Sequence, residues 1–403
     1  MAHTTVTRGG SLALACALVG GLAACSAQDN QTLAVAATGQ APSATTSSVA
    51  AAPAASVKVY PADKASGVLP SATVTVRAGE GTLKSVAVKE SDGTPVPGTI
   101  GADGWHSTSR LRPSVSYTVR AEAVNADGVA TAQTSTFSTL KPESVAQYDI
   151  LPSQSTVGVG MPVSIQFATK VTTKEQRAAV EKNVTVTTSP ATEGSWGWLD
   201  NRQLMWRPKD YWKPGTKVVV KTNLHGLQTG DSKWVGRDGE HTFTIGANQV
   251  STVNMRTHEM TVTRGGQVQR VIPVTTGKDG FTTRSGTKVI IEKVGKMTMD
   301  SATVGIPKGN KEYYKLDTQY NMRVTWTGEF LHSAPWSVGA QGRDNVSHGC
   351  TNMSAANARW MFGFSQVGDV VKFTGSDRPF LPVEGIGVWQ YTYDQWKKQS
   401  ALA

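Results

Sequence analysis

The sequence predicts a mainly β protein, in which two antiparallel β-sandwiches precede a third, β-rich domain. From Val57 onward, apolar and polar residues alternate in short segments, which is the period of a half-buried strand. Glycine, proline, aspartate and asparagine separate these segments, as expected for strands joined by turns. One stretch, residues 354–367, breaks this pattern and has apolar residues at helical spacing. The length of 403 residues suits roughly two to four domains.

Residues 1–24 are predicted to be a signal peptide. Arg8 precedes the apolar run SLALACALVGGLAA, residues 11–24. This run is too short to cross about 30 Å of hydrocarbon but has the length of a signal core. It ends in LAAC, which resembles a bacterial lipobox, where the cysteine is lipidated and becomes the mature N-terminus. We therefore expect an exported lipoprotein anchored in the cell membrane through Cys25; the alternative is an ordinary signal peptide cleaved nearby, with Cys25 incidental.

Residues 25–56 are expected to form a flexible tether that starts at the lipidated cysteine. They consist mainly of Ala, Ser, Thr, Gln and Pro, with almost no charged or aromatic residue. Such a composition cannot bury enough apolar surface to offset the entropy lost on folding. The tether would hold the folded part away from the membrane.

Residues 57–144 and 145–247 are each predicted to form an antiparallel sandwich, because both contain short alternating segments with turn residues between them. In the first region these segments are VKVY, ATVTVRA, KSVAVKE, SYTVRAEAV and TAQTSTFST. In the second they are VSIQFATKV, NVTVTTSP, RQLMWRP, TKVVVKTNL and HTFTIG. Neither region contains a cysteine, so an immunoglobulin-like fold here would lack the disulfide between its sheets.

The second sandwich is rich in tryptophan, with Trp196, Trp198, Trp206 and Trp212. Large aromatic side chains dominate cores, so we expect these residues to pack in the interior. The functional alternative is a carbohydrate site built on them.

Residues 248–375 are predicted to form the third domain, again rich in strands. Its alternating segments are STVNMRTHEMTVTRGG, QVQRVIPVTTG, TKVIIEKVG and MRVTWTGEFLHS. The helical stretch 354–367 begins just after Cys350, with Ser354 as its predicted N-cap. Residues 376–403 are expected to form a C-terminal subdomain that packs back on the third domain through its aromatic residues, Trp389, Tyr391, Tyr393 and Trp396.

The formal charge of +10 favours association with anionic surfaces, which for an exported bacterial protein are phospholipid head groups and acidic wall polymers. The basic residues are scattered and form no block, so a solvated, mildly cationic surface also explains the charge. Nucleic acid is not expected as a partner of an exported protein.

The chemistry is expected at Cys350, in SHGCTN, residues 347–352. The other two cysteines, Cys16 and Cys25, lie in the N-terminal segment, so the mature chain would keep one thiol and form no internal disulfide. The alternative is that Cys350 is a small apolar residue of the core, without a chemical role. A helix that begins nearby and an imidazole that accepts the proton would both favour the reactive thiolate.

Two of the seven histidines, His332 and His348, lie near Cys350 in sequence. His348 would share a face with Cys350 on an extended strand, whereas His332 requires the intervening loop to bring two strand ends together. Spacing alone does not choose the base between them. Gly349 has no side chain, so a substrate carbonyl could approach the N–H groups of residues 349 and 350 and use them as an oxyanion hole.

A zinc site is the chemical alternative, since one cysteine and two histidines can bind zinc. A fourth ligand would have to come from a distant Asp or Glu, and no CxxC or HExxH spacing is present. We therefore expect no metal and no cofactor.

The string HSAPWSVGAQGRDNVSHGCTN, residues 332–352, resembles the signature of the L,D-transpeptidases of bacterial peptidoglycan, the YkuD family. It is similar to the actinobacterial branch, typically a tethered lipoprotein with two immunoglobulin-like domains, a catalytic domain and a C-terminal subdomain. The resemblance covers nearly the whole chain and implies this fold for it. One departure is Thr351, where the family more often has an apolar residue; its side chain is expected to face the core.

The resemblance implies that Cys350 is the nucleophile and His332 the general base, its ring oriented by the backbone carbonyl of Ser333. His348 would lie against the thiol and the donor substrate. Tyr314 would bind the developing oxyanion together with the N–H groups of Gly349 and Cys350. Residues 296–314 would form a lid over the cleft. The positions implied to line the cleft are Met299, Thr327, Gly328, Trp336, Ser347 and Asn352.

The implied reaction is acyl transfer between two stem peptides of peptidoglycan through a cysteine thioester, with release of D-Ala and formation of a 3→3 cross-link between diaminopimelate residues. Carbapenems are expected to acylate the same thiol. The nearest alternatives use the same residues, as an L,D-carboxypeptidase or a protein-to-wall ligase. More distant alternatives are a non-catalytic surface or adhesion protein and a zinc hydrolase.

Overall fold

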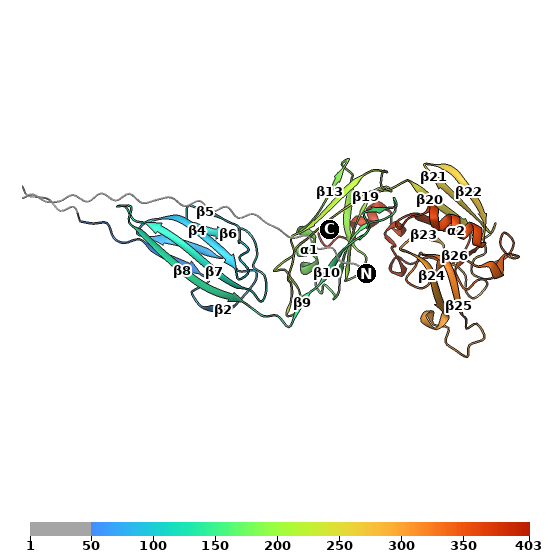
Figure 1. The fold of residues 1–403 in the computed structure, drawn as a ribbon, viewed down its shortest axis with the longest axis horizontal. Helices are drawn as coiled ribbons and strands as arrows, with labels where there is room; N and C mark the ends of the chain where they lie inside the picture. The colour runs from blue at the N-terminus through green and yellow to red at the C-terminus, as the bar shows by residue number, and fades with distance from the viewer. Residues whose placement is uncertain (1–49) are drawn as a thin grey trace, which may run out of the picture. The chain divides into compact units, whose positions relative to one another are not determined.

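The computed structural model describes residues 50–403 and confirms the mainly β prediction (Figure 1). The predicted signal peptide, Cys16, Cys25 and the tether up to residue 49 lie outside the described residues. Each segment predicted as a strand in the two sandwiches forms one. The domain limits proposed from the sequence stay a prediction.

Two four-stranded sheets make up the first sandwich. Its strand β7 alternates strictly, with Tyr117 and Val119 buried and the residues between them directed outward, which is the period predicted from the sequence. The two faces enclose a core that includes Val76, Trp105 and Phe137. The strands, in sheet order, are β1 (Ser56–Tyr60), β3 (Thr75–Gly79), β6 (Gly104–Ser107) and β5 (Gly98–Gly101), then β2 (Ala65–Val68), β8 (Ala130–Thr139), β7 (Ser116–Val124) and β4 (Thr82–Glu90).

The second sandwich also has two four-stranded sheets, with a small third sheet beside them. The main strands, in sheet order, are β10 (Tyr148–Leu151), β12 (Val163–Phe167), β15 (Gln203–Pro208) and β14 (Gly194–Trp198), then β11 (Thr156–Val157), β19 (Gly239–Ile245), β16 (Lys217–Thr222) and β13 (Val184–Ser189). The small sheet contains β17 (Gln228–Gly230), β18 (Lys233–Val235) and β9 (Ser144–Ala146).

The tryptophans of the second sandwich belong to its core. Trp198, Trp206 and Trp212 are 2–7% exposed, and Trp196 packs against the same cluster. Core packing therefore accounts for these residues. Trp198, Trp206 and Trp212 expose almost no ring surface on which a sugar could stack.

A helix that the sequence prediction omitted, α1 (Lys174–Lys182), lies in the second sandwich. Its signal was present: Thr173 and Gln176 form a capping box, in which each side chain accepts a hydrogen bond from the other residue's backbone N–H. This signal was missed because the helical segment is short and lies between two segments with strand patterns.

The third domain contains two sheets and one longer helix. The five-stranded sheet contains, in order, β22 (Gln267–Pro273), β21 (Glu259–Arg264), β20 (Gln249–Asn254), β28 (Val370–Thr374) and β23 (Gly286–Val289). The four-stranded sheet contains β24 (Glu292–Asp300), β25 (Lys315–Arg323), β26 (Phe330–Ser333) and β27 (Thr351–Met353). Apolar side chains of both sheets and of the helix form one core.

The helix α2 (Ala355–Phe364) starts where the sequence predicts, because the hydroxyl of Ser354 accepts a hydrogen bond from the N–H of Asn357. It ends at Phe364, earlier than the predicted residue 367. Strand β27 lies between Cys350 and the first turn of this helix.

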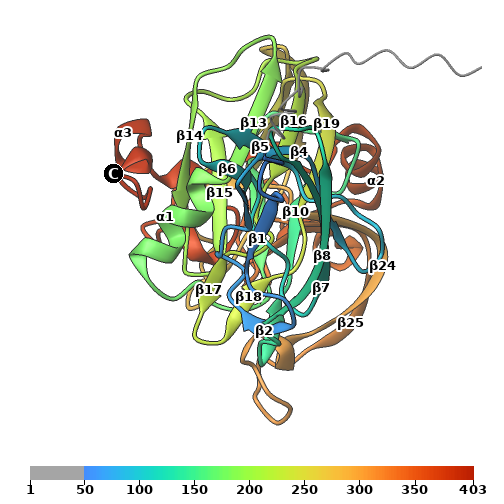
Figure 2. The ribbon, with the colours of Figure 1, turned by 90° about the vertical axis from the view of Figure 1, so that its left-hand side faces the viewer.

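The C-terminal segment bridges two domains, and the expectation that its aromatic residues pack back on the third domain is wrong for Trp396. The indole N–H groups of Trp389 and Trp396 donate to the carbonyl oxygens of Gly160 and Ser195 in the second sandwich, at 2.7 and 3.0 Å. Trp396 is fully buried in the apolar cluster of that sandwich. Figure 2 shows α3 (Tyr393–Lys397) beside β14 and α1.

The same segment also contacts the third domain. The N–H of Phe380 donates to the carbonyl of Ser285 at 2.8 Å, and the side chain of Gln390 donates to the carbonyl of Thr287 at 2.7 Å. Two short 3₁₀ turns, η3 (Pro382–Glu384) and η4 (Val388–Gln390), lie between these contacts and α3.

Candidate active site

Strand pairing brings the candidate nucleophile and base to two neighbouring strands of the four-stranded sheet. β26, which carries His332, pairs in parallel with β27, so that His332 lies opposite Asn352. Cys350 immediately precedes β27. The loop between the two strands folds back so that β27 lies beside β26. His332 and Cys350 are brought near each other in the way that the sequence analysis required.

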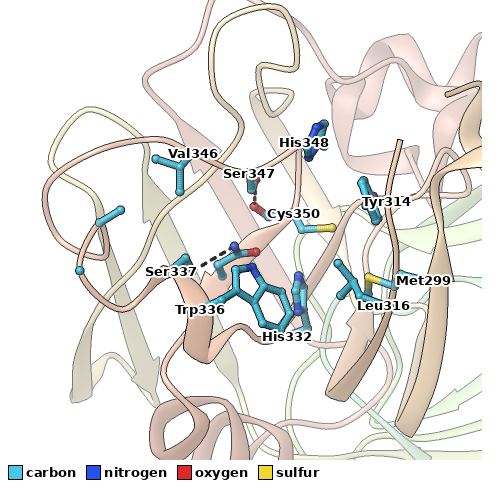
Figure 3. A pocket seen from close by; sticks show the side chains of 13 residues that line it. Met299, Tyr314, Leu316, His332, Trp336, Ser337, Val346, Ser347, His348 and Cys350 are labelled. Carbon is cyan, nitrogen blue, oxygen red and sulfur yellow. Dashed lines mark hydrogen bonds between the residues drawn. The ribbon is translucent and has the colours of Figure 1, made fainter. Parts of the chain in front are cut away.

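Cys350 and His332 both line a cavity of about 440 Å³ on the third domain (Figure 3). Figure 3 shows the thiol directed into this cavity, with His332 and Tyr314 on different sides of it. The structure places eight of the predicted site residues in its lining: Met299, Tyr314, His332, Trp336, Ser347, His348, Cys350 and Asn352. Sequence reasoning did not single out five further lining residues, which are Leu316, Ser337, Gly339, Ala340 and Val346.

Thr327 and Gly328 are not part of this lining, although the resemblance implied that they would be. The hydroxyl of Thr327 donates to that of Thr325 at 3.1 Å. Gly328 contributes its backbone instead, because its carbonyl oxygen accepts a long hydrogen bond from the Cys350 thiol at 3.6 Å.

The ring of His332 is oriented by a backbone group. Its Nδ1–H donates to the carbonyl oxygen of Ser333 at 2.8 Å, and because a carbonyl can only accept, Nδ1 carries the proton in the neutral ring. Nε2 is then free to accept a proton. Burial lowers the pKa of His332 to about 4, against the opposing effects of the Ser333 carbonyl and the Asn352 side chain.

The thiol of Cys350 is 7% exposed, and burial raises its pKa to about 12, partly offset by the backbone N–H of Phe330. The sequence analysis expected a thiolate beside an imidazolium. In this structure both groups are neutral at pH 7, because the buried site disfavours each charge when it stands alone. The thiol donates to the Gly328 carbonyl in this state.

His348 does not contact the thiol through a shared strand face, because Gly349 has a φ of +124° and interrupts the extended chain. Instead its Nε2–H donates to Oε2 of Glu312 at 2.8 Å, and Lys278 donates to the same oxygen at 2.7 Å. The ring of Tyr314 lies 5.0 Å from that of His348, between centroids. Sequence reasoning missed Glu312, which has no local signal within a polar loop.

Tyr314 and Gly349 were implied as oxyanion donors. Burial raises the pKa of Tyr314 to about 12, so its hydroxyl stays protonated and able to donate. The N–H of Gly349 differs from the expectation, because it donates to the hydroxyl of Ser347 at 3.1 Å. That hydroxyl in turn donates to the carbonyl of Cys350 at 2.6 Å, which fixes the turn at the nucleophile.

The predicted lid, residues 296–314, begins as the end of β24 and continues through the 3₁₀ turn η1 (Ser301–Val304). Two hydrogen bonds close its base: the N–H of Ser301 donates to the carbonyl of Tyr314, and the N–H of Tyr314 donates to the hydroxyl of Ser301, both at 3.0 Å. Glu312 joins the far side of this loop to His348. Met299 and Tyr314, at its two ends, line the cavity.

Thr351 is 1% exposed, so its side chain faces the interior as expected. Within residues 50–403, no three His, Cys, Asp or Glu side chains gather in a way that could hold a metal ion. In the same part of the chain, no helix combines the length and apolarity needed to span a bilayer.

The comparison with known proteins agrees with this site. The L,D-transpeptidase catalytic domain matches residues 248–373, and a bacterial Ig domain matches residues 65–228. The chain is 38% identical to L,D-transpeptidase 2 of Mycobacterium tuberculosis, over 85% of this chain and 84% of that protein. The chain belongs to the L,D-transpeptidase family.

A second L,D-transpeptidase of Mycobacterium tuberculosis, L,D-transpeptidase 5, is 34% identical over 87% of this chain and 78% of its own length. A solved L,D-transpeptidase in complex with imipenem has 35% identity and a TM-score of 0.49, and covers 58% of this chain and all (100%) of that one. As an L,D-transpeptidase, this chain places its catalytic domain after the two sandwiches.

Proposed function

We propose that this chain is a peptidoglycan L,D-transpeptidase that forms 3→3 cross-links through a thioester on Cys350. The observation that carries the proposal is the position of Cys350 and His332 on one cavity, with Nδ1 of His332 bound to the Ser333 carbonyl. This arrangement supplies a nucleophile and an oriented base, which are the parts that covalent acyl transfer needs.

In the first half-reaction, the donor is a stem tetrapeptide that ends in D-Ala. Nε2 of His332 takes the proton of the Cys350 thiol as the sulfur attacks the carbonyl carbon of diaminopimelate, the third residue. The C–N bond to D-Ala breaks, the proton on Nε2 goes to the leaving amine, and a thioester remains. Burial disfavours the thiolate and the imidazolium when each stands alone. Here the two charges form together, as an ion pair that lasts only during the proton transfer.

In the second half-reaction, the side-chain amine of diaminopimelate on another stem attacks the thioester. His332 accepts the proton of this amine and returns it to the sulfur as the C–S bond breaks. The product is an amide between two diaminopimelate residues. The Tyr314 hydroxyl and the N–H of Cys350 are the donors we assign to the oxyanion in both halves.

The same chemistry predicts acylation by carbapenems. The thiol attacks the β-lactam carbonyl, the ring C–N bond breaks, and the ring nitrogen receives the proton from His332. The drug remains attached as a thioester, because its leaving amine is still part of the adduct and cannot diffuse away.

Two alternative activities use the same residues. With water as acceptor the enzyme is an L,D-carboxypeptidase, and with an amine on a protein it is a protein-to-wall ligase. Incubation of the purified protein with a disaccharide tetrapeptide separates them by product mass: we expect a cross-linked dimer with loss of one D-Ala, and a tripeptide as the sole product would overturn the transpeptidase proposal. A Cys350→Ala variant with full biological activity would instead favour a non-catalytic surface protein.

We further propose that the protein is exported and anchored in the cell membrane by a lipid on Cys25, facing the cell wall. The sequence LAAC, the apolar run before it and the tether after it support this proposal. Metabolic labelling with a radioactive fatty acid should mark the wild type and not a Cys25→Ala variant. Equal labelling of both proteins would overturn the anchor.

A further inference from the structure

Behind the nucleophile lies a group of charged side chains that the proposed reaction does not use. We call it the buried charge cluster, and its members are Arg284, Lys288, Glu329 and Glu384. Lys288 on β23 is fully buried and Glu329 is 4% exposed. Two cations and two carboxylates balance each other, so the cluster adds no net charge to the interior.

The ion pairs form a continuous chain. Nζ of Lys288 donates to Oε2 of Glu329 at 2.5 Å, and Nη1 of Arg284 donates to Oε1 of Glu329 at 2.9 Å. Nε of Arg284 also forms an ion pair with Oε1 of Glu384 at 2.9 Å. Glu384 comes from the C-terminal segment, so the chain of contacts runs from that segment to the centre of the catalytic domain.

The inner end of the cluster touches the nucleophile turn. A Cβ added to Gly349 would lie 3.7 Å from Cγ of Glu329, so the stem of Glu329 packs directly against the backbone next to Cys350. Thr283, which precedes Arg284, donates through its hydroxyl to the carbonyl of Gly349 at 2.8 Å. The cluster and its neighbour therefore support this turn from two sides.

Backbone groups of two cluster residues, Glu329 and Glu384, hold the loop that accepts the thiol's hydrogen bond. The N–H of Glu329 donates to the hydroxyl of Thr325 at 2.9 Å, and the N–H of Trp326 donates to the carbonyl of Glu384 at 2.7 Å. These contacts fix the ends of residues 325–328. The carbonyl of Gly328 in this loop receives the Cys350 thiol.

A buried ion pair contributes little net stability compared with apolar residues of the same volume. Its charges, in contrast, act strongly on a neighbouring ionisable group in a poorly solvated interior. We propose that the buried charge cluster is a positioning network for Cys350, which holds the nucleophile turn in place, balances charge behind the sulfur and makes reactivity depend on the C-terminal segment through Glu384. This inference rests on the proposed role of Cys350 as nucleophile.

The two inner members should act on the thiol with opposite signs. Glu329 opposes formation of the thiolate, and Lys288 favours it less strongly. Removing Lys288 leaves the sulfur facing the charge of Glu329, whereas removing Glu329 takes away the charge that opposes the thiolate; burial lowers the pKa of Lys288 to about 8, so its charge weakens without its partner. The ionisable groups that line the cavity with the thiol are Tyr314, His332 and His348. Glu329, Lys288 and Arg323 act on the thiol through their charges.

The test measures the alkylation rate of Cys350 by iodoacetamide against pH in the full-length protein, with imipenem acylation as a second readout. Glu329→Gln should shift the alkylation profile to lower pH and raise the rate at pH 8 about threefold or more. Lys288→Met should shift it to higher pH and lower the rate by a similar factor. A purely structural role would change both rates in the same direction.

The double variant Lys288→Met/Glu329→Gln removes both charges, so it should fold even where a single variant is destabilised, and its profile should return toward that of the wild type. Glu384→Gln leaves the inner pair intact and should slow imipenem acylation severalfold. Its matched control is Asp394→Asn, which removes an exposed ion pair with Lys397 in the same segment and should leave the rate unchanged.

The outcomes separate the two proposals. A wild-type protein that imipenem does not acylate would overturn the proposed function. A reactive wild type would overturn the positioning network if the folded single variants shift the profile in the same direction or not at all. The network also fails if the single variants do not fold and Glu384→Gln keeps the wild-type rate of acylation by imipenem.

Discussion

Nδ1 of His332 lies 2.8 Å from the carbonyl oxygen of Ser333, the next residue in the chain, and donates a hydrogen bond to it. This contact takes the place of the carboxylate in a Ser-His-Asp triad. A backbone carbonyl orients the ring and selects its tautomer without bringing a negative charge into the site. The base therefore stays neutral until it takes a proton from the Cys350 thiol or from the acceptor amine.

His332→Ala should lower the rate of acylation by imipenem about 100-fold or more, since the base is lost. Ser333→Ala should stay within about threefold of the wild type, because the orienting group is the backbone and remains in place. Stopped-flow acylation of both purified variants measures this. A large loss in Ser333→Ala with an unchanged melting temperature would contradict orientation by the carbonyl.

The acylation rate should be nearly constant from pH 5 to about pH 9. Burial lowers the pKa of His332 to about 4, so the ring remains a neutral base well below the ordinary value of about 6.5. Burial raises the pKa of Cys350 to about 12, so the thiol remains protonated over the same range. A midpoint near pH 6.5 in the rate of carbapenem acylation would show that a solvated imidazole controls the reaction.

Tyr314→Phe should reduce the acylation rate about 10- to 100-fold, with little change in the melting temperature. The phenol stays protonated at working pH because burial raises its pKa to about 12, and the substitution removes only this donor. Comparison of acylation kinetics with thermal unfolding separates the two effects. Equal rates in the variant and the wild type would remove Tyr314 from the oxyanion site.

Glu312→Ala should release the lid from His348, because Glu312 accepts hydrogen bonds from both Lys278 and His348. We expect an acylation rate about threefold to tenfold lower, since the lid then closes less often over the bound substrate. The neighbouring exposed Lys311→Ala is the control and should behave like the wild type. A Glu312→Ala variant with wild-type kinetics would mean that this contact does not hold the lid.

Trp396→Ala should destabilise the protein by about 3–5 kcal/mol, because the fully buried indole leaves a cavity in the core of the second sandwich. Leu402→Ala, at an exposed position of the same segment, should change the free energy of unfolding by less than about 0.5 kcal/mol. Denaturant unfolding measures both. Similar small effects for the two variants would show that the C-terminal segment is not anchored on the sandwich.

The strands were predictable from sequence because their signal is local. In β7 and β16 the alternation of apolar and polar residues sets both the extended chain and the buried face. The start of α2 was equally local, since Ser354 is an N-cap whose role depends on residues three positions away. The domain on which the C-terminal tryptophans pack could not be predicted. A large apolar side chain indicates burial, but the sequence does not show against which domain.

The site was predictable where residues close in sequence define it. The spacing of His332, His348 and Cys350 predicted that they lie near one another, and all three line one cavity, together with most of the residues that the resemblance implied. The contact between His348 and Glu312 depends on how a long polar loop folds, so no short pattern contained it. The neutral state of the thiol and imidazole was likewise hidden, because it follows from burial at the junction of β26 and β27.

The central claim is that Cys350 alone carries the acyl group. Intact-mass spectrometry of the purified protein, after incubation with imipenem and separately with a disaccharide tetrapeptide, tests it most directly. We expect one adduct on the wild type with each compound and none on Cys350→Ala. An adduct that persists in Cys350→Ala, or one located on another residue, would contradict the account.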